Sequence, residues 1–210
     1  KVVAGFDLDK SCKFAYENNN HVTFYERNIR EVAGSEINKC YSKKAFKILV
    51  GCAPCQPFSQ MRIKMGDSNH ADEKYDLLME FGRLIEEVEP MIVSMENVPK
   101  IRNTEVFKKF LEILKKNGYQ TDGGNVVYCP DYGIAQNRRR FVLLASKLGP
   151  ITLIQPTHSK SKVTVRQFIS GLPTVEAGEV CPLDPMHRTA RLSPLNLTRI
   201  RMSKPGGSWK

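Results

Sequence analysis

The feature that most constrains the fold is the alternation of short apolar runs with amphipathic stretches over the first 146 residues. Six apolar runs are expected to be strands: 2–6, 21–25, 46–51, 91–95, 125–129 and 141–146. Helices are predicted over 9–18, 72–89 and 103–117. This alternation predicts an α/β fold with a doubly wound, mostly parallel sheet, and the last two runs predict a hairpin. The third strand is apolar enough to be expected to be buried on both faces.

Beyond residue 146 the pattern decays, and seven of the twelve prolines lie there. One helix is predicted over 164–170, and the rest of this part is expected to be irregular. We therefore expect a catalytic domain over 1–150 and a basic, proline-containing segment over 151–210. Residues 147–210 carry ten Lys or Arg against three acidic residues, in a chain of net charge +10. This balance is typical of contact with a polyanion and equally of an ordinary solvated surface, so charge alone does not decide.

Composition restricts the class of protein. Hydrophobic residues make up 41% of 210 residues, which is enough for one globular core. No apolar run reaches membrane length, so no membrane contact is expected. The six cysteines are scattered, which is typical of reduced thiols in a cytoplasmic protein rather than of a disulfide framework.

Polar or reactive groups follow the ends of the central apolar runs. They are Asp7, Asn28, the segment from Cys52 to Cys55, and the pair Glu96-Asn97. In an open parallel sheet, ligands bind outside the carboxyl ends of the strands, so these groups are predicted to converge on one crevice. Polar residues end strands very often, so the predicted convergence indicates a site only if these groups can take part in one reaction.

The sequence GCAPCQPFS, residues 51–59, follows the third strand. Cys55 lies between two prolines, on a stiff turn expected to present its sulfur to the crevice. Cys52 and Cys55 form a C-x-x-C, which suggests a thioredoxin-like redox site or half of a zinc site. Pro57 and a polar loop stand where a redox helix would begin, and the chain has no second pair of zinc ligands, so neither alternative is favoured and no metal is expected.

Two further motifs are weak when taken singly. In MENVP, Glu96 ends a buried strand, where a carboxyl group can hold a proton at neutral pH. In QNRRRF, Arg138 and Arg140 alternate, so in an extended segment both point to one face and suit a phosphate or a base carbonyl.

Taken together, Pro-Cys-Gln, Glu-Asn-Val and Gln-x-Arg-x-Arg at these spacings resemble the cytosine-C5 DNA methyltransferase family, of the bacterial restriction-modification type. The resemblance implies a Rossmann-like fold that uses S-adenosylmethionine and releases S-adenosylhomocysteine. It implies methylation of a flipped-out cytosine in double-stranded DNA, in the bacterial cytoplasm close to the nucleoid.

The resemblance also implies roles for single residues. Cys55 matches the nucleophile, Glu96 the acid at cytosine N3, Arg140 the contact to the base carbonyl, and Arg138 a residue that orients the site. The residues that match the cofactor site are Asp7, Leu8, Asn28, Ile29, Pro54 and Leu77. The residues expected to contact DNA are Gln56, Ser59, Gln60 and Gln136. Asn28 departs from the aspartate usual in the family, although an amide oxygen can still accept a hydrogen bond from adenine.

The same resemblance implies segments beyond this sequence. A Gly-rich cofactor loop would precede Lys1, and a target recognition domain would follow Lys210. We therefore expect residues 1–210 to be incomplete, with the remainder on the same chain or on a complementing subunit. The alternatives are a tRNA cytosine-C5 methyltransferase of the same family and a non-catalytic nucleic-acid-binding relative.

Overall fold

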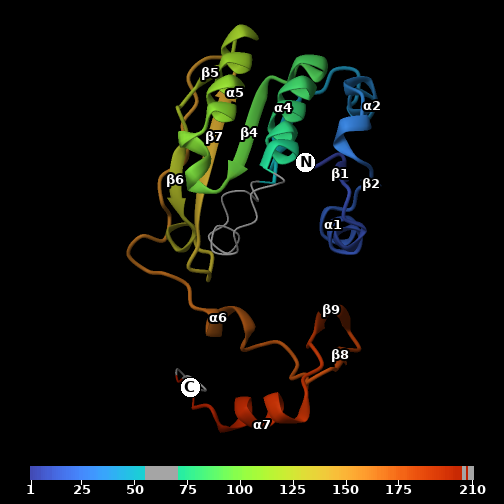
Figure 1. Ribbon diagram of the computed structural model, residues 1–210, viewed down its shortest axis with the longest axis vertical. Coiled ribbons are helices and arrows are strands. Elements are labelled where there is room, and N and C mark those ends of the chain that lie inside the picture. Colours follow the sequence, from blue (N-terminus) through green and yellow to red (C-terminus); the bar gives the residue numbers. More distant parts are fainter. Residues whose placement is uncertain (55–70, 205–206, 208–210) are drawn as a thin grey trace. The chain divides into compact units, whose positions relative to one another are not determined.

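The computed structural model describes residues 1–54, 71–204 and 207, with only the helical backbone described for 71–76. The chain divides into two compact units, Lys1–Val165 and Arg166–Lys210. The first unit contains the α/β elements (Figure 1).

The main sheet has five strands. Its order is β3 (Ile48–Gly51), β4 (Ile92–Asn97), β7 (Arg139–Ser146) and β5 (Gln120–Thr121), with β6 (Asn125–Tyr128) also paired to β7. β3 is parallel to β4, whereas β7 is antiparallel to β4, β5 and β6. Four strands therefore run in one direction and β7 alone is reversed. The predicted mixed α/β fold with a mostly parallel sheet is confirmed, as is the hairpin of β6 and β7.

A separate pair of strands lies at the amino-terminal end. β1 (Gly5–Asp7) and β2 (Phe24–Glu26) pair in parallel. Between them run the 3-10 turn η1 (Lys10–Cys12), capped by the Asp9 side chain, and α1 (Lys13–Asn20). The predicted strand-helix-strand order is confirmed here, although each strand is shorter than predicted.

The two long helices were predicted within about two residues of their ends. They are α4 (Ala71–Val88) and α5 (Glu105–Lys116). The Thr104 hydroxyl caps α5 by accepting from the Phe107 N–H at 3.3 Å. The short elements escaped the sequence analysis, because one or two turns carry too little periodicity to detect. They are η2 (Ile29–Glu31), α2 (Gly34–Lys39), η4 (Pro99–Asn103) and η5 (Cys129–Tyr132).

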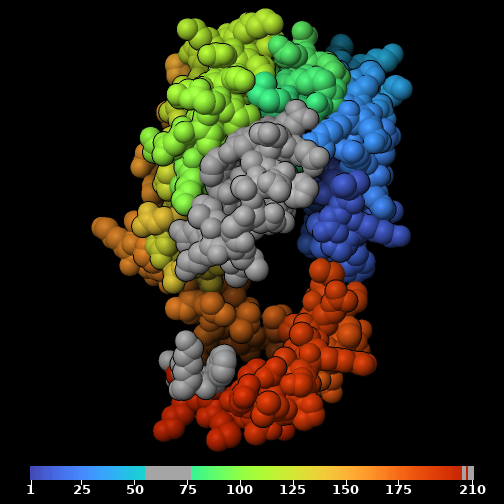
Figure 2. Space-filling view, in the orientation of Figure 1, coloured from blue at the N-terminus to red at the C-terminus, as the bar shows by residue number. Residues whose placement is uncertain are grey.

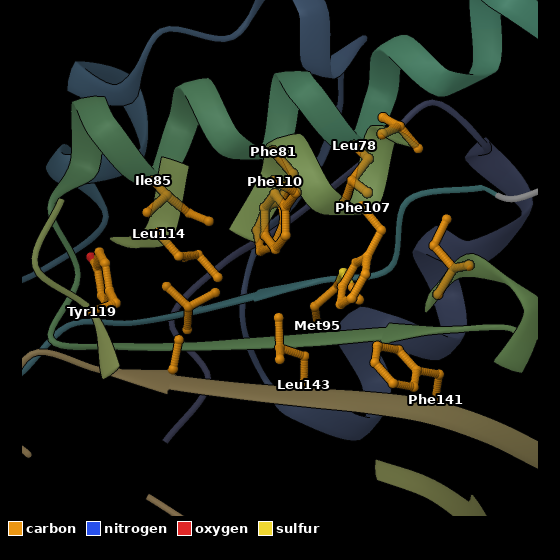
Figure 3. Close-up of a cluster of buried hydrophobic side chains, with 14 residues drawn as sticks. Leu78, Phe81, Ile85, Met95, Phe107, Phe110, Leu114, Tyr119, Phe141 and Leu143 are labelled. Atoms are coloured by element: carbon orange, nitrogen blue, oxygen red, sulfur yellow. The ribbon is translucent and has the colours of Figure 1, made fainter. Parts of the chain in front are cut away.

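The core lies between the sheet and one layer of helices (Figure 3). Alternate residues of β4 and β7, among them Met95 and Leu143, face α4 and α5 and are fully buried. The Phe81 ring of α4 stacks on the Phe110 ring of α5, with centroids 5.8 Å apart. At the end of the core, the Tyr119 hydroxyl donates to the Pro90 carbonyl at 2.5 Å. This packing fixes the positions of β4 and β7, and hence of the residues at their ends.

One prediction about the sheet is wrong. β3 is not buried on both faces, since Ile48 is 46% exposed and Val50 is 70% exposed. Within the described ranges β4 is its only paired neighbour, so β3 lies at an edge. Apolar composition predicted a strand but could not show whether both of its faces are covered.

The second unit is more regular than predicted. The expected helix is present as α6 (Val165–Ile169), but β8 (Val180–Cys181), β9 (Asp184–Arg188) and α7 (Pro194–Met202) are additional, and the prediction of irregular chain is wrong. The Ser193 hydroxyl caps α7, and Pro194 stands in its first turn, where a missing N–H costs nothing.

The first unit extends to Val165. The His158 N–H donates to the Asp131 carbonyl at 2.8 Å, and the Tyr132 hydroxyl donates to the Ile154 carbonyl at 3.2 Å. These contacts hold residues 151–165 to the first unit. None of the helices in the described ranges has the length and apolarity to cross a bilayer.

Replacing Phe110 by alanine tests the packing of α5 on the sheet. Phe110→Ala is expected to lower the free energy of unfolding by about 3–5 kcal/mol, because a large, fully buried side chain leaves a cavity. The neighbouring exposed Lys109 gives the control, and Lys109→Ala should change stability by less than about 0.5 kcal/mol. Urea unfolding followed by circular dichroism measures both, and equal losses would contradict this core.

Candidate active site

The site is built around Glu96, next to last in β4. Glu96 lies opposite Val142 of β7, so Arg140 is its diagonal neighbour on the same face of the sheet. Arg140 Nε lies 2.5 Å from Glu96 Oε1, and the Arg140 side chain is only 19% exposed. The antiparallel register of β4 and β7 therefore brings together an acid and an arginine that are far apart in sequence.

Cys52 approaches the same carboxylate from β3. Gly51 pairs with Met95, so the next residue along each parallel strand places Cys52 beside Glu96. Cys52 as a whole residue is exposed, but its Sγ–H donates to Glu96 Oε2 at 2.7 Å. Burial, and then this hydrogen bond, raises the pKa of the Cys52 thiol to about 12. The sequence predicted the segment from Cys52 to Cys55 at this crevice, but it gave Cys52 itself no role beyond half of a C-x-x-C.

Asn97 anchors the chain that leads to the predicted nucleophile. Its side chain is buried, and its Nδ2 donates to the Ala53 carbonyl at 2.9 Å. The Val98 N–H donates to Asn97 Oδ1 at 2.8 Å. The amide oxygen thus fixes the side chain to its own segment, and the amide nitrogen holds the backbone just before Pro54. Four of the predicted site residues lie outside the described residues: Cys55, Gln56, Ser59 and Gln60.

Arg138 precedes β7 and is exposed, and Gln136 is exposed in the connection from β6. The Arg138 charge acts on Cys52, whose pKa it lowers against the larger effects that raise it. Arg139 differs from its neighbours, since its guanidinium lies 5.1 Å from the centre of the Tyr128 ring. The expected alternation of the three arginines is consistent with this arrangement.

Asp7 is the last residue of β1, and Leu8 follows it directly; both were predicted to bind a cofactor. Both are exposed, Leu8 to 68%, and Asp7 Oδ1 accepts from the Asp9 N–H at 2.9 Å. The Asp7 charge also raises the pKa of Cys52, although it is the smallest of the causes.

Asn28 and Ile29, the second such pair, lie at the start of η2. Asn28 Oδ1 accepts from the Arg30 N–H at 3.2 Å and so caps this turn. An aspartate could make the same cap, which gives a physical reason for either residue here. Of the remaining two, Pro54 is exposed after β3 and Leu77 is half-buried on α4. The described residues hold no cluster of three or more His, Cys, Asp or Glu side chains suited to a metal ion.

The sequence of residues 1–180 matches the family model described as C-5 cytosine-specific DNA methylase. The chain belongs to this family. It is 49% identical to the type II methylase M.HgiDII of Herpetosiphon aurantiacus, over 99% of this chain and 58% of that protein. It is 29% identical to the DNA (cytosine-5)-methyltransferase 1 of Mus musculus, over 70% of this chain and 10% of the mouse protein. The chain thus spans less than two thirds of the length of these relatives.

A solved structure of the S. pombe Dnmt2 methyltransferase shares the fold. It superposes with a TM-score of 0.56 at 15% identity, over 73% of this chain and 44% of that one. Identity this low supports the methyltransferase fold and no finer property. Membership of the family therefore rests on the sequence matches.

The raised pKa of Cys52 predicts a poorly reactive thiol. A pKa of about 12 leaves about one thiolate in 10⁴ at pH 8, and the thiolate is the form that iodoacetamide modifies. We expect Cys52 to resist alkylation in the native protein while the exposed Cys12 is modified, as measured by tandem mass spectrometry. Glu96→Gln removes a charge that raises this pKa and should increase labelling of Cys52. Equal labelling of Cys52 and Cys12 would contradict the arrangement.

Proposed function

We propose that the protein transfers a methyl group from S-adenosylmethionine to C5 of a flipped-out cytosine in double-stranded DNA, as part of a restriction-modification system. The supporting observation is the contact of Glu96 with Arg140 at the strand ends, beside the anchored backbone that leads to Cys55. Membership of the cytosine-C5 methylase family makes this chemistry the first candidate.

In this proposal Cys55 is the nucleophile. Its thiolate adds to C6 of cytosine, and the electron pair of the C5–C6 bond becomes available at C5. Glu96 protonates N3, or donates a hydrogen bond to it, and so stabilises the charge that develops during addition. After methylation C5 loses its proton to a proton acceptor, and the bond from C6 to the Cys55 sulfur breaks. The target cytosine must leave the DNA stack for the thiolate to reach C6.

Arg140 and Cys52 divide the Glu96 carboxylate between them. Arg140 holds Oε1, and the Cys52 thiol occupies Oε2. A thiol is a weak hydrogen-bond donor, so Oε2 can release Cys52 at little cost. Once protonated, the same oxygen can donate to N3 of an incoming cytosine. Arg140 would then keep the carboxyl group oriented while contacting the base carbonyl, and the exposed Arg138 would orient the site.

The exposed residues at the end of β1 suit S-adenosylmethionine, which supplies the methyl group when bound. Asp7 offers a carboxylate for ribose hydroxyls, and Leu8 offers an apolar surface for adenine. Asn28 and Ile29 would complete the adenine side. Pro54 and Leu77 would line the pocket towards the reacting groups, in a Rossmann-like, doubly wound arrangement.

DNA is the proposed macromolecular partner. We assign Gln56, Ser59, Gln60 and Gln136 to the DNA side, and the excess of Lys and Arg in residues 147–210 suits phosphate contacts, which position the protein without reading the sequence. A complementing subunit stays a prediction.

Replacing Cys55 tests the covalent step. Cys55→Ala is expected to abolish methyl transfer to duplex DNA and the covalent complex with DNA containing 5-fluorocytosine, because no sulfur can add to C6. Cys12→Ala, at an exposed position on η1, should retain both and serves as the control. Tritium transfer and gel electrophoresis measure the two activities, with tRNA as a second substrate. Substantial methylation by Cys55→Ala would overturn the assignment.

Glu96→Gln tests the acid. The amide keeps a similar shape but has no carboxyl proton, so methyl transfer should fall on the order of 10²-fold or more. Binding of S-adenosylmethionine should stay nearly unchanged, as measured by calorimetry, because Glu96 is assigned to the base. A variant with the turnover of the unmodified protein would exclude this role.

A further inference from the structure

Arg83 of α4 joins two segments that are far apart in the sequence. Its Nη2 donates to the carbonyls of Ile29 and Val32, at 3.2 and 3.0 Å. These carbonyls stand at the start of η2 and directly after it. A single guanidinium therefore holds both ends of the turn that Asn28 caps.

The guanidinium is itself held in place on α4. Its Nε donates to Glu80 Oε2 and its Nη1 to Glu87 Oε1, each at 2.7 Å. These acids lie three residues before and four residues after Arg83, so they fix the side chain from both directions along the helix. The fork of Arg83 is thus already oriented towards the carbonyls, a geometry that a lysine ammonium cannot reproduce.

Glu87 adds a second tie to the same loop. Its Oε2 accepts from the Gly34 N–H at 2.6 Å, at the first residue of α2. That bond, and then the contact with Arg83, lowers the pKa of Glu87. A Cβ at Gly34 would lie 2.4 Å from the Glu87 Cβ, so only glycine permits this approach. Figure 2 shows the segment that contains α2, in blue, against α4, in green.

An apolar cluster lies beneath these polar contacts. It joins Val32 and Ile37 of the loop and α2 to Leu84 and Val88 of α4, with Ile29 packed against it. The cluster supplies adhesion without direction, whereas hydrogen bonds fix position. The hydrogen bonds of Arg83 can therefore fix the position of the Ile29 backbone along the axis of α4.

We infer that Arg83 is a positioning residue for the cofactor site. It fixes the position of Asn28 and Ile29 relative to Leu77, which lies on α4 as Arg83 does. This inference rests on the proposed function, in which those three residues bind S-adenosylmethionine. Arg83 itself acts through the backbone of the loop. Its loss should therefore weaken cofactor binding while leaving the chemistry of the Glu96 cluster intact.

Arg83→Met tests this by removing the guanidinium but keeping an apolar stem. The dissociation constant of S-adenosylmethionine should rise on the order of 10-fold, because two charge-assisted hydrogen bonds to the loop are lost. The turnover number at saturating cofactor and the KM for DNA should stay within about 2-fold. Arg83→Lys should give an intermediate affinity. Lys108→Met, which removes an exposed pair with Glu105 on α5, is the matched control and should change nothing.

Hydrogen exchange provides a readout that does not depend on activity. In Arg83→Met the amides of residues 29–36 should exchange faster, while those of α5 stay as protected as in the unmodified protein. Faster exchange throughout both segments, unchanged cofactor affinity, or a fall in turnover at saturating cofactor would each overturn the inference. If the folded, unmodified, full-length protein binds no S-adenosylmethionine, that result would instead overturn the proposed function.

Discussion

The pairing of β4 with both of its neighbours is the constraint on which the site depends. β4 is parallel to β3 on one side and antiparallel to β7 on the other. The first pairing delivers Cys52 to Glu96 and the second delivers Arg140. Met95, one residue earlier, is fully buried against the helices, so the strand cannot slip by one residue without exposing its core face. The same register that buries the core thus orients the acid.

Arginine is used for two different purposes in the first unit. Arg140 contacts a carboxylate at a strand end, where a bound base would meet both groups. Arg83 contacts carbonyls and carboxylates between α4 and a loop, where no reacting atom is expected. Both use the planar fork to fix direction rather than to supply net attraction. The site therefore depends on positional rigidity that begins well outside the reacting residues.

The sequence predicted the long elements well because each carries several periods of its pattern. Both α4 and α5 have clear apolar faces. In addition, α4 ends shortly before Pro90, and Thr104 caps α5. The errors have physical causes. β3 reads as buried because it is apolar, yet Val50 is 70% exposed. The helix α7 is only weakly amphipathic, so its start at Ser193-Pro194 was a better signal than its periodicity.

In the site, too, some features were predicted from the sequence and others were not. Motif spacing indicated Glu96, Arg138 and Arg140, and family membership now supports the chemistry that those residues suggested. The convergence of the Cys52 segment with Glu96-Asn97 was predicted, but its individual hydrogen bonds were not. The bonds from Cys52 to Glu96, from Asn97 to Ala53 and from Arg83 to Ile29 each join residues more than forty positions apart.

The sequence by itself determined which residue types stand at the ends of the apolar runs, since motifs are local and strand and helix periods are short. Only the tertiary structure decided which side chains at these ends contact one another. Strand register is set by packing over the whole sheet, as Met95 and Leu143 show, and a single apolar run carries no information about its partner. The Glu96 carboxylate consequently has an arginine on one oxygen and a thiol on the other for reasons that lie in β7 and β3.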